Sequence, residues 1–200
     1  MNRPEHERSI RNEILDVSRN GGMTAKASFT LRNRLFRAMW IVAWTLLARW
    51  TPPPLHGWRR GVLRAFGAKV GKGVRIYGST RVWYPPNLVL GDHVAIGWQV
   101  KLYNQGMVTI EDYAIVSQHT HVVAGTHDID DPYFQLQVRP IRIGRQAWVA
   151  SGAFVGPGVT VGEGAVLGAR GVAFRDLMPW TVYRGNPAVE IKKRRPFTLP

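Results

Sequence analysis

Aliphatic residues recur at every sixth position over most of the chain. Near the C-terminus they include Ile143, Val149, Val155 and Val161, and small or β-branched residues stand four positions after most of them. The same frame can be followed upstream to Val70, giving fifteen rows of six residues with two short slips and one long break. A period of six fits neither an amphipathic helix nor an alternating strand. It predicts an all-β solenoid over residues 68–195, in which three rows make one triangular coil and about five coils stack in parallel.

The stretch before the repeats has the spacing of a helix instead. We predict one helix from Phe29 to Trp50, ended by the prolines at 52–54, and a short second helix from His56 to Phe66. The helical segment as a whole is assigned to residues 28–67. Apolar residues recur on the first helix at spacings of three and four, as one apolar face requires: Leu35, Met39, Val42, Leu46 and Trp50.

Three roles for this first helix stay open. It can cap the first coil, or cap it and also contact an anionic membrane surface, because Trp40, Trp44 and Leu47 widen the apolar face and arginines flank it. Crossing a bilayer needs about 20 apolar residues, whereas the uncharged run from Ala38 to Ala48 has eleven.

Charge and composition restrict the partners. The formal net charge of +14 favours anionic ligands, and many arginines lie in the N-terminal third. No nucleic-acid-binding motif accompanies the charge, so nucleic acid is not expected. Cysteine is absent from the sequence, which excludes disulfides and thiolate chemistry and fits a cytoplasmic protein. Residues 1–27 are polar and predict a flexible arm rather than a signal peptide.

The long break in the repeat begins directly after His127. The chain leaves the solenoid there and returns at Ile141, so residues 128–140 predict a long loop on a rigid scaffold. A histidine at the base of such a loop can act as a general base, because imidazole titrates near neutral pH.

The C-terminal run "WVASGAFVGPGVTVGEGAVLGARGVAFRDLMPWTVYRGNPAVEIKKR" resembles the hexapeptide-repeat acyltransferases throughout. Together with "GTHDIDDPYF" and the aromatic N-terminal helix, it is most similar to the colanic-acid-type exopolysaccharide acetyltransferases. The resemblance implies a left-handed parallel β-helix and acetyl-CoA as cosubstrate, with no metal. It also implies O-acetylation of a sugar acceptor, on an exopolysaccharide or a lipid-linked glycan precursor.

The resemblance carries over to individual positions. His127 and Asp130 match the histidine and the aspartate of the family's H-x-x-D motif, in which the histidine is the general base. Asp128 or Asp130 can orient the imidazole, or either can equally cap the loop. Asn104 matches an acceptor-binding asparagine, or is a turn residue. The positions that match CoA-binding residues are Trp148, Ser151, Ala169, Phe174, Arg175 and Lys192.

The backbone amide near Ser151 is the candidate oxyanion donor. Phe174 replaces a frequent threonine and Val189 a frequent basic residue, so phosphate contacts are also expected from 192–195. Because the CoA groove needs a second prism, the resemblance implies a homotrimer.

Other functions remain open beside this one. The acceptor can be an amino sugar or another hydroxyl compound. Zinc-dependent carbonic anhydrases share this β-helix, and His119 and His121 would be the metal candidates, with a trimer needed to gather them. A non-catalytic scaffold would need neither an ordered loop nor affinity for CoA.

Overall fold

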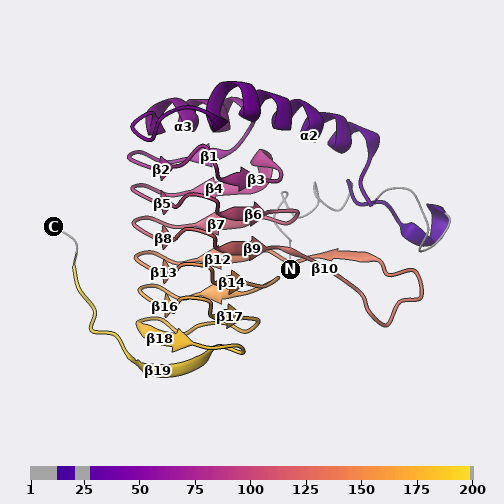
Figure 1. The fold of residues 1–200 in the computed structure, drawn as a ribbon. Coiled ribbons are helices and arrows are strands. Elements are labelled where there is room, and N and C mark those ends of the chain that lie inside the picture. Colours follow the sequence, from indigo (N-terminus) through magenta and orange to yellow (C-terminus); the bar gives the residue numbers. More distant parts are fainter. Residues whose placement is uncertain (1–12, 21–27, 199–200) are drawn as a thin grey trace, which may run out of the picture.

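The computed structural model describes residues 13–20 and 28–198, which form a three-walled parallel β-helix closed at one end by helices (Figure 1). The predicted left-handed parallel β-helix is confirmed. Wall 1 consists of β1 (Lys69–Val70), β4 (Leu88–Leu90), β7 (Val108–Ile110), β12 (Ile141–Ile143) and β15 (Thr160–Val161). Wall 2 consists of β2 (Arg75–Ile76), β5 (Ala95–Ile96), β8 (Ile115–Val116), β13 (Trp148–Val149), β16 (Val166–Leu167) and β18 (Thr181–Arg184), with β19 (Val189–Lys193) added antiparallel. Wall 3 consists of β3 (Arg81–Val82), β6 (Lys101–Tyr103), β9 (His121–Val123), β14 (Phe154–Val155) and β17 (Val172–Ala173).

The solenoid has about six turns, one more than predicted. Five coils are complete, and Leu177, which bridges to Val161, and β18 belong to a sixth. We name the corners by the walls they join: the first corner joins walls 1 and 2, the second joins walls 2 and 3, and the third joins walls 3 and 1. The short slip near Pro85 is a 3-10 turn, η4 (Pro85–Asn87), at the third corner of the first coil.

The six-residue rhythm predicts the core correctly. Row-leading residues point inward because adjacent coils pair in parallel register, as Ile76 pairs with Ile96 and Val149 with Leu167. From Ile76 to Ala173 each row-leading residue is buried, and the small residues four positions later fill the corners. Val70 in the first coil is the exception and is partly buried.

Two helices close the N-terminal end of the prism (Figure 1). α2 (Leu31–Trp44) continues into a π-helical turn, η3 (Thr45–Arg49), and α3 (His56–Ala65) follows. Trp40 and Trp44 face the first coil, where their indole nitrogens donate to the carbonyl oxygens of Val82 at 2.7 Å and Gly78 at 3.0 Å. The helix therefore caps the first coil, as one of the alternatives expected.

The face of α2 that packs on the prism is the opposite of the one marked by the predicted spacing. Trp40, Trp44 and Ala48 are buried, whereas Leu35 and Met39 are 62% and 54% exposed. Both faces of α2 are rich in apolar residues. The face that packs on the prism is the one whose tryptophans reach unpaired backbone carbonyl groups of the first coil. Among the described residues, no helix is long and apolar enough to cross a membrane.

Several arginines expected to serve an anionic ligand hold the cap together. Arg59 is fully buried and its guanidinium donates to the carbonyl oxygens of Thr51, Pro52, Pro53 and Ile76. These bonds fix the proline-rich connection between η3 and α3 against the first coil, and burial lowers the pKa of the Arg59 guanidinium.

The predicted polar arm concerns residues that lie mostly outside the described ranges. Its described part contains a 3-10 turn, η1 (Val17–Asn20), and Ile14 bridges to Phe29 just before α2.

Candidate active site

The break after His127 is a two-stranded hairpin that projects from the third corner of the third coil (Figure 1). β10 (Gly125–His127) pairs antiparallel with β11 (Leu136–Val138), and residues 128–135 form its tip. The hairpin arises because Arg139 bonds to the Ala124 carbonyl and the chain then re-enters wall 1 at Ile141. His127 therefore stands on an ordered strand, at the start of the exposed tip.

The imidazole of His127 is held in one orientation by the tip. Its Nδ1 lies 2.7 Å from the carbonyl oxygen of Phe134, and the Phe134 ring stacks on it at 4.5 Å with an interplanar angle of 11°. A carbonyl oxygen only accepts, so the neutral ring carries its proton on Nδ1 and a free lone pair on Nε2. His127 is exposed, so Nε2 is accessible to a hydroxyl group.

Asp128 and Asp130 are the two carboxylates that can orient His127 or cap the loop. Asp128 accepts from the Asp130 amide at 3.2 Å and from the Gln137 side chain at 3.0 Å, as a loop-capping residue does. In the described part of the chain, no carboxylate bonds to the imidazole. The orienting role of Asp130 stays a prediction, whereas the Phe134 carbonyl was not foreseen, because a main-chain group leaves no mark in a sequence.

The N-terminal segment braces the hairpin from the outside. Gln135 accepts from the Val17 amide at 2.9 Å and donates to the Leu15 carbonyl at 3.2 Å. It is adjacent to Phe134, so these bonds also help to fix the carbonyl that orients His127. This contact spans 118 residues of sequence and has no local signal.

Asn104 lies at the third corner one coil above the hairpin and is fully buried. Its side chain accepts from the amides of Trp83 and Tyr84 and donates to the Tyr84 carbonyl at 2.7 Å. The side chain thus performs the turn role that was the alternative reading of this asparagine. Acceptor binding by Asn104 stays a prediction.

Ser151 and Ala169 occupy the second corner in successive coils. The Arg170 amide donates to the Ser151 carbonyl at 2.9 Å, and the Ser151 hydroxyl donates to the Gln118 carbonyl at 3.2 Å. Higher in the same column stand Trp98 and His119, whose rings contact edge to face at 4.5 Å. The corner therefore carries the small residues Ser151 and Ala169 in its lower coils and aromatic rings above.

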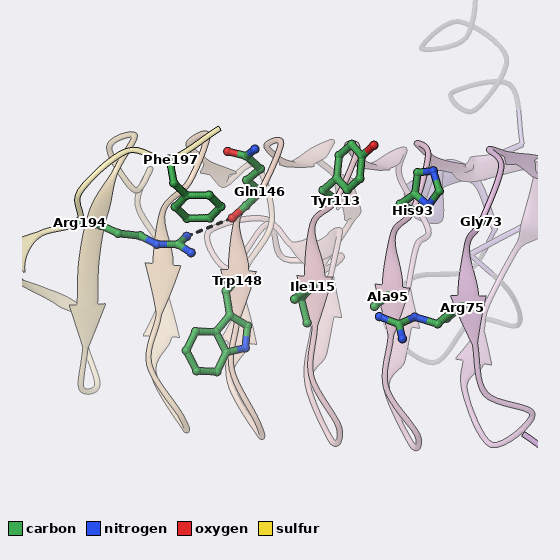
Figure 2. Close-up of a pocket in the computed structure, with 10 residues that line it drawn as sticks. All are labelled: Gly73, Arg75, His93, Ala95, Tyr113, Ile115, Gln146, Trp148, Arg194 and Phe197. Carbon is green, nitrogen blue, oxygen red and sulfur yellow. Dashed lines mark hydrogen bonds between the residues drawn. The ribbon is translucent and has the colours of Figure 1, made fainter. Parts of the chain in front are cut away.

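Trp148 lies on the outer side of wall 2, in a hollow of 540 Å³. Figure 2 shows its neighbours along the wall, Ile115, Ala95 and Arg75, with Phe197 and Arg194 of the C-terminal tail at the side. The Trp148 indole donates to the Ser117 hydroxyl at 2.9 Å, which directs the ring along the wall toward the second corner.

Phe174 and Arg175 lie at the third corner of the fifth coil, below the hairpin. Phe174 is 63% exposed and packs on Phe154 with ring centroids 5.4 Å apart. Its ring covers Gly156, where any Cβ would collide with it. Arg175 is exposed beside it.

The basic tail is only partly available to a ligand. Arg194 donates to the carbonyls of Gln146 and Gly164, and burial lowers the pKa of its guanidinium. Lys193 pairs with Glu190 at 2.8 Å. Lys192 is exposed on β19.

A groove of 780 Å³ runs between α2 and wall 3 and was not foreseen from the sequence. Its lining includes the cationic side chains Arg37, Arg49, Arg81 and Lys101, the aromatic rings Trp83 and Tyr103, and the histidines His119 and His121. Burial lowers the pKa of His121, and the nearby positive charge of Lys101 lowers it further.

Over residues 13–20 and 28–198, no group of three or more His, Asp or Glu side chains is arranged to hold a metal ion.

A single chain does not bring the predicted residues together. His127, Phe174 and Arg175 lie at the third corner, whereas Ser151 and Ala169 lie at the second. In a triangular prism these are different vertical columns. A base from one corner and an oxyanion donor from the other can share one substrate only if a second prism lies alongside.

Comparisons with known proteins identify relatives in sequence and in fold. No protein-family model matches the chain. The chain is 39% identical over 173 residues to the protein named colanic acid biosynthesis acetyltransferase WcaF in Escherichia coli K12, and equally to the protein of that name in Shigella flexneri. Each match covers 86% of this chain and 95% of the relative.

Solved structures show the same fold at lower identity. The maltose O-acetyltransferase from Clostridium difficile 630 has a TM-score of 0.77 at 24% identity, over 84% of this chain and 90% of that one. A galactoside acetyltransferase in complex with coenzyme A has a TM-score of 0.78 at 20% identity, over 97% and 92%. The acetyltransferase VCA0836 from Vibrio cholerae O1 biovar eltor, complexed with acetyl coenzyme A, has a TM-score of 0.76 at 17% identity, over 91% and 100%.

Proposed function

Because the chain belongs to the hexapeptide-repeat acetyltransferases of the colanic-acid type, we propose that it transfers the acetyl group of acetyl-CoA to a sugar hydroxyl. The acceptor is part of an exopolysaccharide or of its lipid-linked precursor. The names of the relatives support this choice, since they refer to colanic acid biosynthesis, and two structural neighbours act on maltose and on a galactoside. Complexes of two neighbours with coenzyme A or acetyl-CoA support the donor.

The observation that carries the proposal is the imidazole of His127, which belongs to an exposed residue and is held at Nδ1 by the Phe134 carbonyl. Nε2 removes the proton of the acceptor hydroxyl as its oxygen attacks the thioester carbonyl carbon. The tetrahedral intermediate then collapses, the carbon–sulfur bond breaks, and the imidazolium returns the proton to the thiolate. The products are an acetyl ester and free CoA.

We propose that CoA lies along the second corner of one protomer. The small residues Ser151 and Ala169 allow its pantetheine arm to approach the backbone, and the Ser151 amide is the oxyanion donor. Trp148 packs against the arm. Lys192 of that protomer meets the nucleotide end, together with Phe174 and Arg175 from the third corner of the neighbouring prism, and Arg175 and Lys192 lie close to the phosphates.

The active unit is a homotrimer in this proposal. The separation of His127 from Ser151 on different corners supports it, since a neighbouring prism would supply the missing column. Ile115 and Trp148, exposed by 44% and 43% on wall 2, also support it, because apolar side chains of this size favour burial. Each of the three interfaces would then hold one complete site.

We place the acceptor in the groove between α2 and wall 3. The groove includes Tyr103, and Tyr103 pairs with Val123, four residues before His127. Aromatic rings suit the faces of a sugar, and the four cationic side chains suit a phosphate carried by it. Asn104 supports the backbone of the third corner, next to the bound acceptor. Asp130 is a second group that can orient the His127 imidazole once substrate is bound.

The test is the release of CoA thiol from acetyl-CoA with a panel of sugars and amino sugars. His127→Ala should lower kcat by about 10²- to 10⁴-fold, the usual contribution of a general base, while the dissociation constant for CoA stays near that of the parent. Turnover equal to the parent would exclude His127 as the base. Absence of thiol release by the parent with every hydroxyl acceptor would overturn the function itself.

Tyr133→Ala is the matched control. Tyr133 lies in the same hairpin tip and is 44% exposed, but it does not bond to the imidazole of His127. It should keep most of the turnover. A loss as large as that of His127→Ala would mean that the loop, rather than the imidazole, is what matters.

A further inference from the structure

The outward face of the capping helix carries a continuous row of apolar side chains, which we call the outer stripe. Its members are between 54% and 73% exposed and follow one another at three- and four-residue spacing: Leu31, Leu35, Met39, Val42, Leu46 and Trp50. The stripe lies directly opposite the buried tryptophans that cap the prism. Large exposed apolar side chains gathered on one surface indicate a binding face rather than ordinary surface composition.

Trp50, the last member of the stripe, and Trp58, which extends it, are both suited to an apolar medium. Trp50 and Trp58 are 73% and 52% exposed, yet both indole nitrogens already donate, to the carbonyls of Leu46 and Leu47, each at 2.6 Å. Neither ring would leave an unpaired donor if it entered a lipid environment. Their positions at the end of the helix suit the boundary between headgroups and acyl chains.

The charge around the stripe has one sign. Between residues 17 and 91 the chain has 13 Lys and Arg residues and no Asp or Glu, so all 13 acidic residues lie outside this segment. On α2 and η3, the exposed cations Arg32, Arg34 and Arg49 flank the stripe. The carboxylate of Glu13 lies against buried Asn33, on the inner side of α2. The outer side of this end therefore combines an apolar ridge with an excess of positive charge.

We propose that the outer stripe docks the protein on the surface of an anionic bilayer, with α2 lying in the plane of the headgroups. The helix crosses the end of the solenoid (Figure 1), and the outer stripe is on its solvent-exposed side. The walls therefore stay free for other contacts. It does not span the membrane. A second copy of the chain is a poorer occupant, because α2 and η3 carry arginines and no Asp or Glu, so two such faces would repel each other.

The docking does not depend on the proposed acetyl transfer, and cyclic symmetry would strengthen it. In a trimer whose axis follows the solenoids, the three stripes lie at the same end and face the same way. The acceptor groove also lies under the same helix, with Arg49 and Ile41 among its lining. A glycan attached to a lipid would then enter the groove without leaving the membrane.

The experiment is flotation of the full chain with vesicles of phosphatidylcholine alone and with vesicles of equal phosphatidylcholine and phosphatidylglycerol. We expect binding to the mixed vesicles, weakened by high salt. Leu35→Gln/Met39→Gln/Leu46→Gln should lower partitioning by about 10- to 100-fold, because three apolar side chains no longer enter the interface. Arg32→Gln/Arg34→Gln/Arg49→Gln should abolish the preference for phosphatidylglycerol.

The matched control is Val189→Gln/Ile191→Gln, which removes exposed apolar side chains from β19 at the far end of the solenoid. It should bind vesicles like the parent. Circular dichroism establishes that each variant is folded, and the single change Leu35→Gln replaces the triple if the triple is not. Failure of the parent to bind either vesicle, parent-like binding by the stripe variant, or stripe-dependent self-association without lipid would each overturn the proposal.

Discussion

In the walls of the prism, each row-leading side chain from Ile76 to Ala173 faces inward and is at most 6% exposed, whereas in helix α2 a row of equally apolar side chains faces solvent. The difference follows from the number of neighbours. A wall strand pairs with the strand of the next coil, and most wall strands are paired on both sides, so the register determines which residues face inward. A capping helix meets one surface, and its rotation is set by whichever face packs best on that surface.

The tryptophans decide this rotation. The indole groups of Trp40 and Trp44 reach the carbonyls of Val82 and Gly78, which the first coil cannot pair with another coil. Leu35 or Met39 in the same place would bury those carbonyls without a donor, at about 1–3 kcal/mol each. Hydrophobic spacing therefore identifies an apolar face, while hydrogen-bonding capacity selects the face that is covered.

The largest expected effect is a difference in unfolding free energy between substitutions on the two faces of α2. Trp40→Ala should lower the free energy of unfolding by about 3–5 kcal/mol, because it leaves a cavity over the first coil and an unpaired Val82 carbonyl. Met39→Ala, one residue away on the outer stripe, should change it by less than about 0.5 kcal/mol. Urea unfolding at fixed protein concentration measures both. Equal losses would mean that the outer stripe is covered within the molecule.

A smaller loss of unfolding free energy is expected when a buried isoleucine is shortened, either in the first coil under the helical cap or in an inner coil. Ile76 lies under the helices and Ile110 lies in the third coil, and both are fully buried. If the cap completes the core, Ile76→Val and Ile110→Val should each cost about 0.5–1.5 kcal/mol. The measurement is again urea unfolding. A clearly smaller loss at Ile76 would indicate that the cap covers the first coil only loosely.

The smallest effect concerns an outward-facing position of the prism. Burial, with a smaller contribution from Lys101, lowers the pKa of His121 in the folded chain, whereas the unfolded chain recovers an ordinary value near 6.5. The neutral ring is therefore favoured on folding, and this contribution to stability is complete above about pH 6.5 and is lost as the pH falls toward the lowered pKa. His121→Gln should reduce the acid dependence of the thermal midpoint between about pH 7 and pH 5.

Lys101→Gln is the companion change. It removes the second cause but not the burial of His121, so it should reduce the acid dependence only in part. A midpoint whose acid dependence is the same in the parent and in His121→Gln would show that this ring does not contribute.

The sequence predicts the prism well because each row repeats the same physical requirement. Val149 and Val155 face inward for the same reason, so an error at one row would be corrected by the next. The corner roles of Ser151 and Ala169 can be located in the same way. The sixth turn was missed because Leu177 and β18 no longer keep the six-residue frame.

What could not be predicted depends on contacts between distant segments. The Phe134 carbonyl orients His127 through the backbone, and Gln135 reaches residues of the N-terminal segment more than 100 positions away. Arg59 reads as surface charge in the sequence but becomes buried, because the carbonyls of the proline-rich connection need a donor. Such pairings become visible only once the fold has brought the groups together.

The antiparallel strand β19 has a consequence for the length of the molecule. A stack of identical coils presents the same template at its last turn as at every other, so nothing in the repeat itself stops further copies from adding end to end into a filament. Here the last parallel strand of wall 2, β18, is paired instead with a reversed strand that carries Glu190, Lys192 and Lys193 on exposed positions. Charged residues of this kind make an unattractive template for another chain. The helices close the other end, and the solenoid remains a particle of fixed size.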